Sequence, residues 1–189
     1  MKLALVKITA FATTLCFACT GCFITHRTEC ARTDEIVHEN DQVLKKEGFT
    51  PVYFSGSYHN TIRHISKGYL TEEHQFATLP TARFFIVEQV EAFVKPLNEE
   101  KSIRIYLQDY PFSAKNISLQ FHFLDKTSKP LLYPNFAQIN CMQGQVTYYY
   151  WDEVTNNPCL AFSERYDQAL NSYNKSKLIN WKPKPKTQQ

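Results

Sequence analysis

Residues 101–151 decide the fold, and they contain the runs Ile103-Arg104-Ile105-Tyr106-Leu107-Gln108 and Ile117-Ser118-Leu119-Gln120-Phe121-His122-Phe123. In both runs apolar and polar residues alternate, which is typical of a strand with one buried face. Two more strands are predicted at residues 137–142 and 145–151, on either side of Gln143-Gly144, where glycine suits the positive φ of a tight turn. Four successive strands are therefore predicted in this segment.

Helical patterns flank these strands. Pro80 begins a helix with apolar residues at helical spacing, and Pro96 marks the point where it must stop or bend. A second helix is predicted after Asn157-Pro158, because a further set of apolar residues recurs at helical intervals there. This set is Phe162, Tyr166, Ala169 and Tyr173.

The segment before these elements gives weaker patterns. A surface helix is predicted to begin at Thr33 or Asp34 and to run to Glu47. Residues 49–54 suit a strand or an extended segment, and Pro51 argues against a central position in a sheet. Residues 58–71 show no clear pattern, and an alternative is that residues 49–78 close the open face of the sheet.

The order helix, four strands, helix predicts an α+β domain of two layers, in which helices pack on one face of an antiparallel sheet of about four strands. A chain of 189 residues that is 43% hydrophobic suits one such domain, placed at residues 34–174. Residues 175–189 contain five lysines and no acid, so they are predicted to form a flexible basic tail. The body is mildly acidic, and a nucleic-acid partner is not expected.

The N-terminus has the layout of a secretory signal peptide, predicted at residues 1–21. Lys2 and Lys7 precede the apolar stretch Ile8 to Phe17, and small residues follow it. The apolar run is at or below the roughly 17 residues that a membrane-spanning helix needs, so a permanent transmembrane anchor is not favoured.

Within this segment, Cys19-Thr20-Gly21-Cys22 resembles the lipobox of bacterial lipoproteins, with Cys19 at the position where that family usually has leucine. The resemblance implies that Cys22 is lipidated and becomes the first residue of the mature chain, with Cys19 as a second candidate. Residues 22–33 would then be a tether to a membrane of the bacterial envelope, inner or outer. The alternative interpretation is an ordinary cleaved signal peptide.

The positions of two cysteines suggest a disulfide bond in the folded domain. An exported protein meets an oxidising compartment, so a disulfide between Cys141 and Cys159 is predicted, while the alternative is that both are small buried apolar residues. Cys30 has no predicted partner. The chain has no paired C-x-x-C motifs, and neither a structural metal nor a cofactor is predicted.

Aromatic residues supply the candidate binding surface. The stretch from Asn98 to Ile117, which contains Tyr110-Pro111-Phe112, resembles uncharacterised exported proteins of intracellular bacteria, a group for which no activity is implied. Tyr110 and Phe112 are expected to flank a structural corner. Tyr149 and Trp151 are expected on the outer sheet face, where they either bind a sugar ring, a peptide or a protein, or are ordinary strand residues covered by residues 36–70.

No catalytic motif accompanies these features: the chain lacks a G-x-S-x-G elbow, a glycine-rich phosphate loop and an H-E-x-x-H pair. The sequence therefore favours an envelope lipoprotein with an exported binding or interaction module, which contacts the membrane through its lipid and an envelope protein or polymer through its body. Two alternatives are a small exported enzyme with a pocket between helices and sheet, and a secreted factor that acts on a host. Paired inward carboxylates, or a histidine with a carboxylate, would favour the enzyme.

Overall fold

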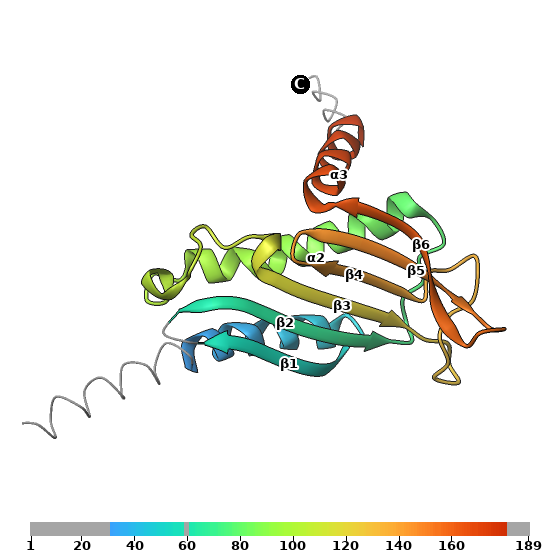
Figure 1. Ribbon diagram of the computed structural model, residues 1–189, viewed down its shortest axis with the longest axis horizontal. Coiled ribbons are helices and arrows are strands. Elements are labelled where there is room, and N and C mark those ends of the chain that lie inside the picture. Colours follow the sequence, from blue (N-terminus) through green and yellow to red (C-terminus); the bar gives the residue numbers. More distant parts are fainter. Residues whose placement is uncertain (1–30, 59–60, 181–189) are drawn as a thin grey trace, which may run out of the picture.

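The computed structural model describes residues 31–58 and 61–180, which form an α+β domain with a single six-stranded sheet in the order β1-β2-β3-β4-β5-β6 (Figure 1). The signal segment, Cys19, Cys22, most of the predicted tether and the end of the tail lie outside the described residues. The elements are an N-terminal helix over residues 31–46, β1 (Thr50–Tyr58), β2 (Ile62–Thr71), α2 (Leu79–Glu99), β3 (Ile117–Phe123), β4 (Gln138–Met142), β5 (Gln145–Asp152), β6 (Asn157–Arg165) and α3 (Tyr166–Asn180).

The sheet is mixed rather than purely antiparallel. β2 and β3 run parallel, with Ile65 opposite Ile117, and α2 makes the crossover between them. All other neighbouring strands are antiparallel. The predicted α+β class is therefore confirmed. The predicted number of about four antiparallel strands is too low, because β1, β2 and β6 also belong to the sheet.

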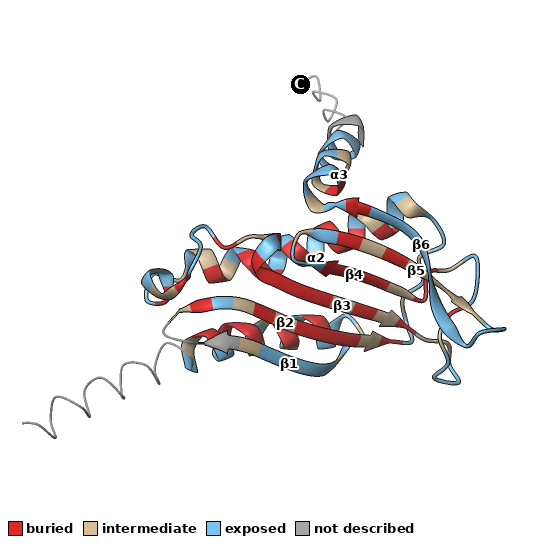
Figure 2. Ribbon diagram, in the orientation of Figure 1, coloured by how far each residue is buried: buried red, intermediate tan, exposed pale blue. Residues whose placement is uncertain are grey.

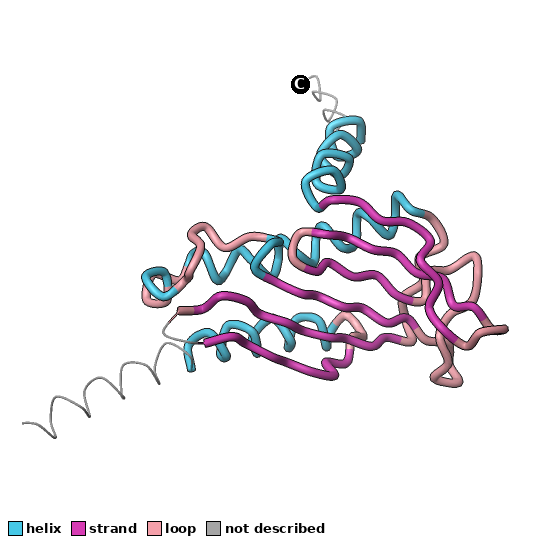
Figure 3. The backbone as a smooth tube through the Cα atoms, in the orientation of Figure 1, coloured by secondary structure: helices cyan, strands magenta, loops and turns pink. Residues whose placement is uncertain are grey.

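The predicted strand at residues 103–108 is wrong. This segment is a turn with a short 3-10 helix (Arg104–Tyr106), and Figure 3 shows no strand between α2 and β3. Ile103 and Leu107 are buried whereas Ile105 is 79% exposed, so the burial repeats every four residues instead of every two. The side-chain amide of Asn98 fixes the following loop, because it accepts from the backbone N–H of Phe112 at 2.7 Å and donates to the carbonyl of Phe112 at 2.8 Å.

The predicted helix after Asn157 is also displaced. Residues Asn157–Arg165 form β6, which pairs with β5, and the helix begins only at Tyr166. Seven of the first eight residues of β6 are exposed because it is the last strand of the sheet, so its sequence carries no alternation. The later part of the predicted pattern is correct, since Ala169 and Tyr173 of α3 are buried.

The N-terminal helix is confirmed, with different ends. It is already helical at residue 31, so Thr33 and Asp34 lie inside the helix and neither caps it. Its end at residue 46 is followed by Gly48, whose φ of 83° is the left-handed conformation that often terminates helices. In α2, Pro96 does not stop the helix, which continues to Glu99.

The hydrophobic core lies between the helices and one face of the sheet. Its centre is an aromatic cluster of Phe49, Phe85 and Phe121, which come from the link between the N-terminal helix and β1, from α2 and from β3. The ring centroids of Phe85 and Phe121 are 4.9 Å apart, and those of Phe49 and Phe121 are 5.6 Å apart, both in edge-on geometry. Such pairs are favourable beyond their buried area.

Two buried carboxylates join helices to the sheet. Asp41 of the N-terminal helix accepts from Lys67 at 2.7 Å and from the hydroxyl of Tyr69 at 2.9 Å, both on β2. At the other end of the sheet, Glu164 of β6 accepts from Arg83 of α2 at 2.8 Å and from the hydroxyl of Tyr148 at 2.9 Å. Burial and the adjacent carboxylate raise the pKa of both tyrosines.

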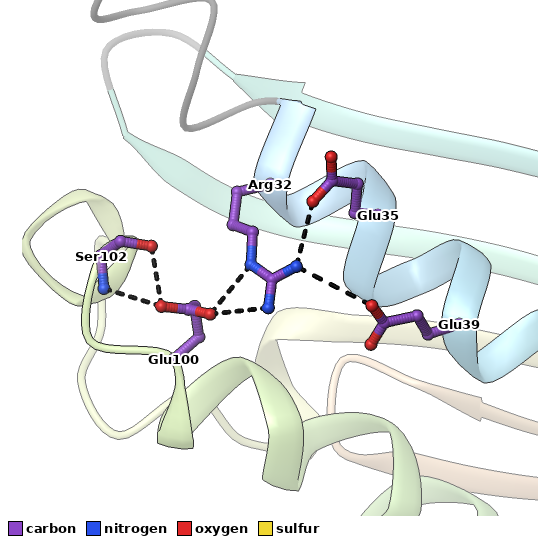
Figure 4. A network of polar contacts seen from close by, with 5 residues as sticks. All are labelled: Arg32, Glu35, Glu39, Glu100 and Ser102. Carbon is purple, nitrogen blue, oxygen red and sulfur yellow. Dashed lines mark hydrogen bonds and ion pairs between the residues drawn. The ribbon is translucent and has the colours of Figure 1, made fainter.

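A more exposed network links the N-terminal helix to the end of α2. Figure 4 shows Arg32 between Glu35 and Glu39 of its own helix and Glu100, whose carboxylate is 2.9 Å from the guanidinium. The backbone N–H and hydroxyl of Ser102, together with Arg32, lower the pKa of Glu100 to about 2. Because these side chains reach solvent, the network orients the helix more than it stabilises the fold.

We predict that Asp41→Ala lowers the free energy of unfolding by about 3–5 kcal/mol, because it leaves the buried Lys67 ammonium without a counter-charge. Lys67→Met in addition to Asp41→Ala should recover much of this loss. Asp167→Ala removes an exposed pair with Arg165 and should cost only about 0–1 kcal/mol. Urea unfolding of the three variants checks this, and equal losses for Asp41→Ala and Asp167→Ala would contradict it.

Candidate functional site

All three helical segments leave one face of the sheet uncovered. In Figures 1 and 2 the N-terminal helix and α2 lie behind the strands, and the view looks onto the free face. Because side chains alternate along a strand, Leu119 and Phe121 point to the helices while Gln120 and His122 point away. We call the second set of positions the open face. On the central strands it consists of His64, Ser66, Gly68, Leu70, Ser118, Gln120, His122, Gln138, Asn140, Met142, Gln145, Thr147, Tyr149 and Trp151.

The open face carries no Asp, Glu, Lys or Arg, although these residues make up 21% of the chain. Its centre consists of amides and hydroxyls, several of them recessed: Ser118 and Asn140 are only 5% and 4% exposed although no helix covers them. The amide of Gln138 donates to Asn140 at 3.0 Å, and His64 lies 2.9 Å from the hydroxyl of Ser118. These contacts hold the polar groups in fixed positions.

Both histidines of this face favour the neutral form. Partial burial disfavours the charged imidazolium, and it lowers the pKa of His64 and of His122 below the ordinary value of 6.5. The open face is therefore uncharged at neutral pH. A charged ligand would find no counter-charge on its central strands.

Aromatic rings flank the polar centre. Tyr149 and Trp151 are two residues apart on β5, and both are half-buried on the open face. Trp151 also lines a small cleft of about 320 Å³, together with Pro130 and Leu132 and with the charged residues Asp125, Lys129 and Glu153. Residues 36–70 do not cover these rings, because they form the N-terminal helix on the opposite face and the strands β1 and β2; that part of the prediction is wrong.

A third ring lies over β2. Tyr53 of β1 pairs with Gly68, and a Cβ atom at Gly68 would lie 2.1 Å from the tyrosine ring. Glycine is thus required for the ring to lie against the sheet. Tyr53 itself is 38% exposed, so one of its sides remains free.

The other two predicted binding aromatics lie elsewhere. Tyr110 is 51% exposed in the loop before β3, where the Arg104 guanidinium lies 4.7 Å from its ring centre. Phe112 is buried, so it cannot be an exposed binding residue, and its role in the loop is structural. The four predicted aromatics therefore do not form one site.

The predicted disulfide is not formed, and Cys141 and Cys159 are free thiols. Cys141 on β4 pairs with Val146 of β5, whereas Cys159 on β6 pairs with Tyr150 of β5. A whole strand and four residues of register therefore separate them, which places their Cα atoms well beyond the ~7 Å that a disulfide allows. Burial raises the pKa of Cys141 to about 12, so its thiol is unreactive.

A second cleft, of about 750 Å³, lies on the helix side between α2, the β4–β5 turn and the start of α3. We call it the helix-side cleft. Its floor includes Val94 and Leu170, and its rim carries Glu91 and Asp167. Both carboxylates already have partners, since Glu91 accepts from the hydroxyl of Tyr166 at 2.7 Å and Asp167 pairs with Arg165 at 2.8 Å. Its lining has no histidine, so it lacks the acid–base pairs that would favour an enzyme.

Comparison with protein-family models, curated proteins and solved structures gives no significant match. Among residues 31–58 and 61–180, no group of three metal-ligating side chains is close enough to hold an ion. No helix in the same part of the chain combines the length and apolar character needed to cross a bilayer. The function therefore has to be argued from the two surfaces described above.

We predict that the free energy of unfolding falls as the pH drops from about 7 to about 5, because the unfolded chain binds protons at histidine more readily than the folded chain does. The pKa values of His64 and His122 are lowered in the folded chain. Their contribution to stability is therefore fully present above about pH 6.5 and is lost as the pH falls below it. The double variant His64→Gln/His122→Gln should flatten this dependence, while His38→Gln on the N-terminal helix serves as the control. An unchanged slope in the double variant, measured by urea unfolding, would contradict it.

Proposed function

We propose that this chain is an exported, lipid-anchored binding module of the bacterial cell envelope, and that the open face is its binding surface. The observation that carries this proposal is the uncovered side of a six-stranded sheet without a single charged residue on its central strands. A face that only meets water usually carries lysine, glutamate and threonine at the outward positions of its strands. The recessed amides and half-buried rings of this face suit contact with a ligand better than contact with bulk water.

The anchor part of the proposal rests on Cys22. A diacylated and N-acylated cysteine supplies the two or more chains that stable membrane attachment requires. The folded domain then needs no membrane-seeking surface of its own, and its open face is left for an envelope protein or polymer. If the chain is instead released without lipid, the secreted host-interacting factor becomes the better proposal.

We predict that cells expressing Cys22→Ser fail to incorporate a palmitate analogue into the protein, whereas cells expressing Cys19→Ser incorporate it normally. The thiol of Cys22 is the proposed acceptor of the diacylglyceryl group, so its removal abolishes the anchor. Intact mass of the protein from the envelope should show a chain that begins at Cys22 and carries acyl mass. Unchanged labelling of Cys22→Ser, or a mature chain without acyl mass, would contradict the anchor.

We predict that the open face is occupied in the native envelope. In a background that carries Cys30→Ser and Cys159→Ser, Thr147→Cys places a thiol at the centre of the open face, and Ser172→Cys places one on α3 with a similar partial exposure. A maleimide should label Thr147→Cys several-fold more slowly in envelopes than in the purified protein, because the bound ligand covers it. Ser172→Cys should react at the same rate in both.

Equal rates for Thr147→Cys in the two preparations would contradict an occupied open face. Protection of Ser172→Cys alone would contradict it as well. The helix-side cleft, which Ser172 does not line, is the second candidate site. That cleft has the volume of a small-molecule site, about 750 Å³. It supports the alternative of an exported protein that acts on or carries a small ligand.

A further inference from the structure

We infer that the ligand of the open face is an uncharged glycan chain that contains N-acetylated sugars. The inference rests on the proposed function of the open face as a binding surface and names the class of ligand. It follows from three properties of the described residues, which are the charge of the face, its hydrogen-bonding groups and its rings.

The absence of charged side chains from the open face argues against ionic ligands. Nucleic acids and other polyanions are held by Lys and Arg contacts, and the open-face positions of the central strands have neither. Cationic ligands need carboxylates, which are also missing from these positions. Arg165 lies at the margin on β6, but its guanidinium is already paired with Asp167.

Hydrogen-bonding groups match the chemistry of sugars. Four side-chain amides face outward, on Gln120, Gln138, Asn140 and Gln145, and Thr147 adds a hydroxyl between them. Each amide both donates and accepts, as do a sugar hydroxyl pair and the acetamido group of an N-acetylated sugar. Within the described part of the chain, the Nδ2 of Asn140 makes no hydrogen bond, while its Oδ1 accepts from Gln138. A donor is thus held in place and left for a ligand.

Ring spacing matches a chain of linked sugars. Tyr149 and Trp151 lie on the same side of β5, about 7 Å apart along the strand. Both rings are partly exposed. Aromatic rings pack on the C–H faces of sugar rings, while the hydroxyls around the sugar reach the amides.

A protein partner fits the face less well. Stable protein interfaces place apolar and aromatic anchors at the centre and polar groups at the rim. The open face has the reverse arrangement, because amides and hydroxyls hold the centre and the rings of Tyr53, Tyr149 and Trp151 lie toward its margins. Burying that centre against a protein would leave several amides to be satisfied.

The test is calorimetric titration of the full-length protein, solubilised in detergent, with the hexamer of N-acetylglucosamine. We expect binding that changes by less than about twofold between low and high salt, because no phosphate-type ion contacts are involved. Trp151→Ala and Tyr149→Ala should each weaken binding by about tenfold or more. Tyr110→Ala, which removes a more exposed ring outside the open face, should leave the affinity unchanged.

The variant Gln138→Glu distinguishes loss of binding from loss of folding, since it keeps the side-chain size and adds one charge beside Asn140. It should abolish binding while the near-ultraviolet circular dichroism stays that of the parent. The inference is overturned if the parent protein does not bind the hexamer, if both ring variants and Gln138→Glu bind it normally, or if polygalacturonate displaces it. If the face is protected from maleimide in envelopes while the hexamer does not bind, the glycan inference fails and the proposed function stands.

Discussion

The contact of Phe121 with Phe85 and Phe49 is the interaction on which the rest of the structure depends. It brings together β3, α2 and the link between the N-terminal helix and β1 in one aromatic cluster, and all of it lies on one side of the sheet. Each of these rings buries a large apolar area, so the chain gains most of its stability from a single layer of helix-on-sheet packing. The other side of the sheet contributes little to stability, which leaves its residues free to serve binding.

The edges of the sheet are protected against pairing with a further strand. β1 and β6 are the two outer strands, and each combines a proline with a bulge: Pro51 with an extra Val52, and Pro158 with an extra Ala161. Both devices interrupt the row of backbone donors that another strand would need for pairing. With its edges protected in this way and one face packed against helices, the open face is the broad surface of the sheet that stays exposed.

The sequence predicted the parts of the fold in which burial follows a simple period. Apolar and polar residues alternate along β3 and the first half of β5, and α2 repeats its apolar residues at helical spacing. β2 was missed because one of its buried positions is Lys67, which is neutralised by Asp41 from 26 residues away. β6 was missed because an exposed edge strand shows no alternation, and residues 103–108 were misread because Ile105 is apolar but exposed. In each case a tertiary partner, or the lack of one, overrode the local pattern.

The candidate site was predictable only in part, for a related reason. Alternation within β5 is enough to place Tyr149 and Trp151 on the outer face. The amides of Gln120, Gln138 and Asn140 are polar residues at outward positions, and within any one strand they look like ordinary solvated side chains. Their meaning appears only when β3, β4 and β5 are placed side by side, because the combined surface then contains no charge at all. A surface kept neutral over several strands, with a recessed amide at its centre, is better explained by a neutral polar ligand than by solubility, for which charges serve better.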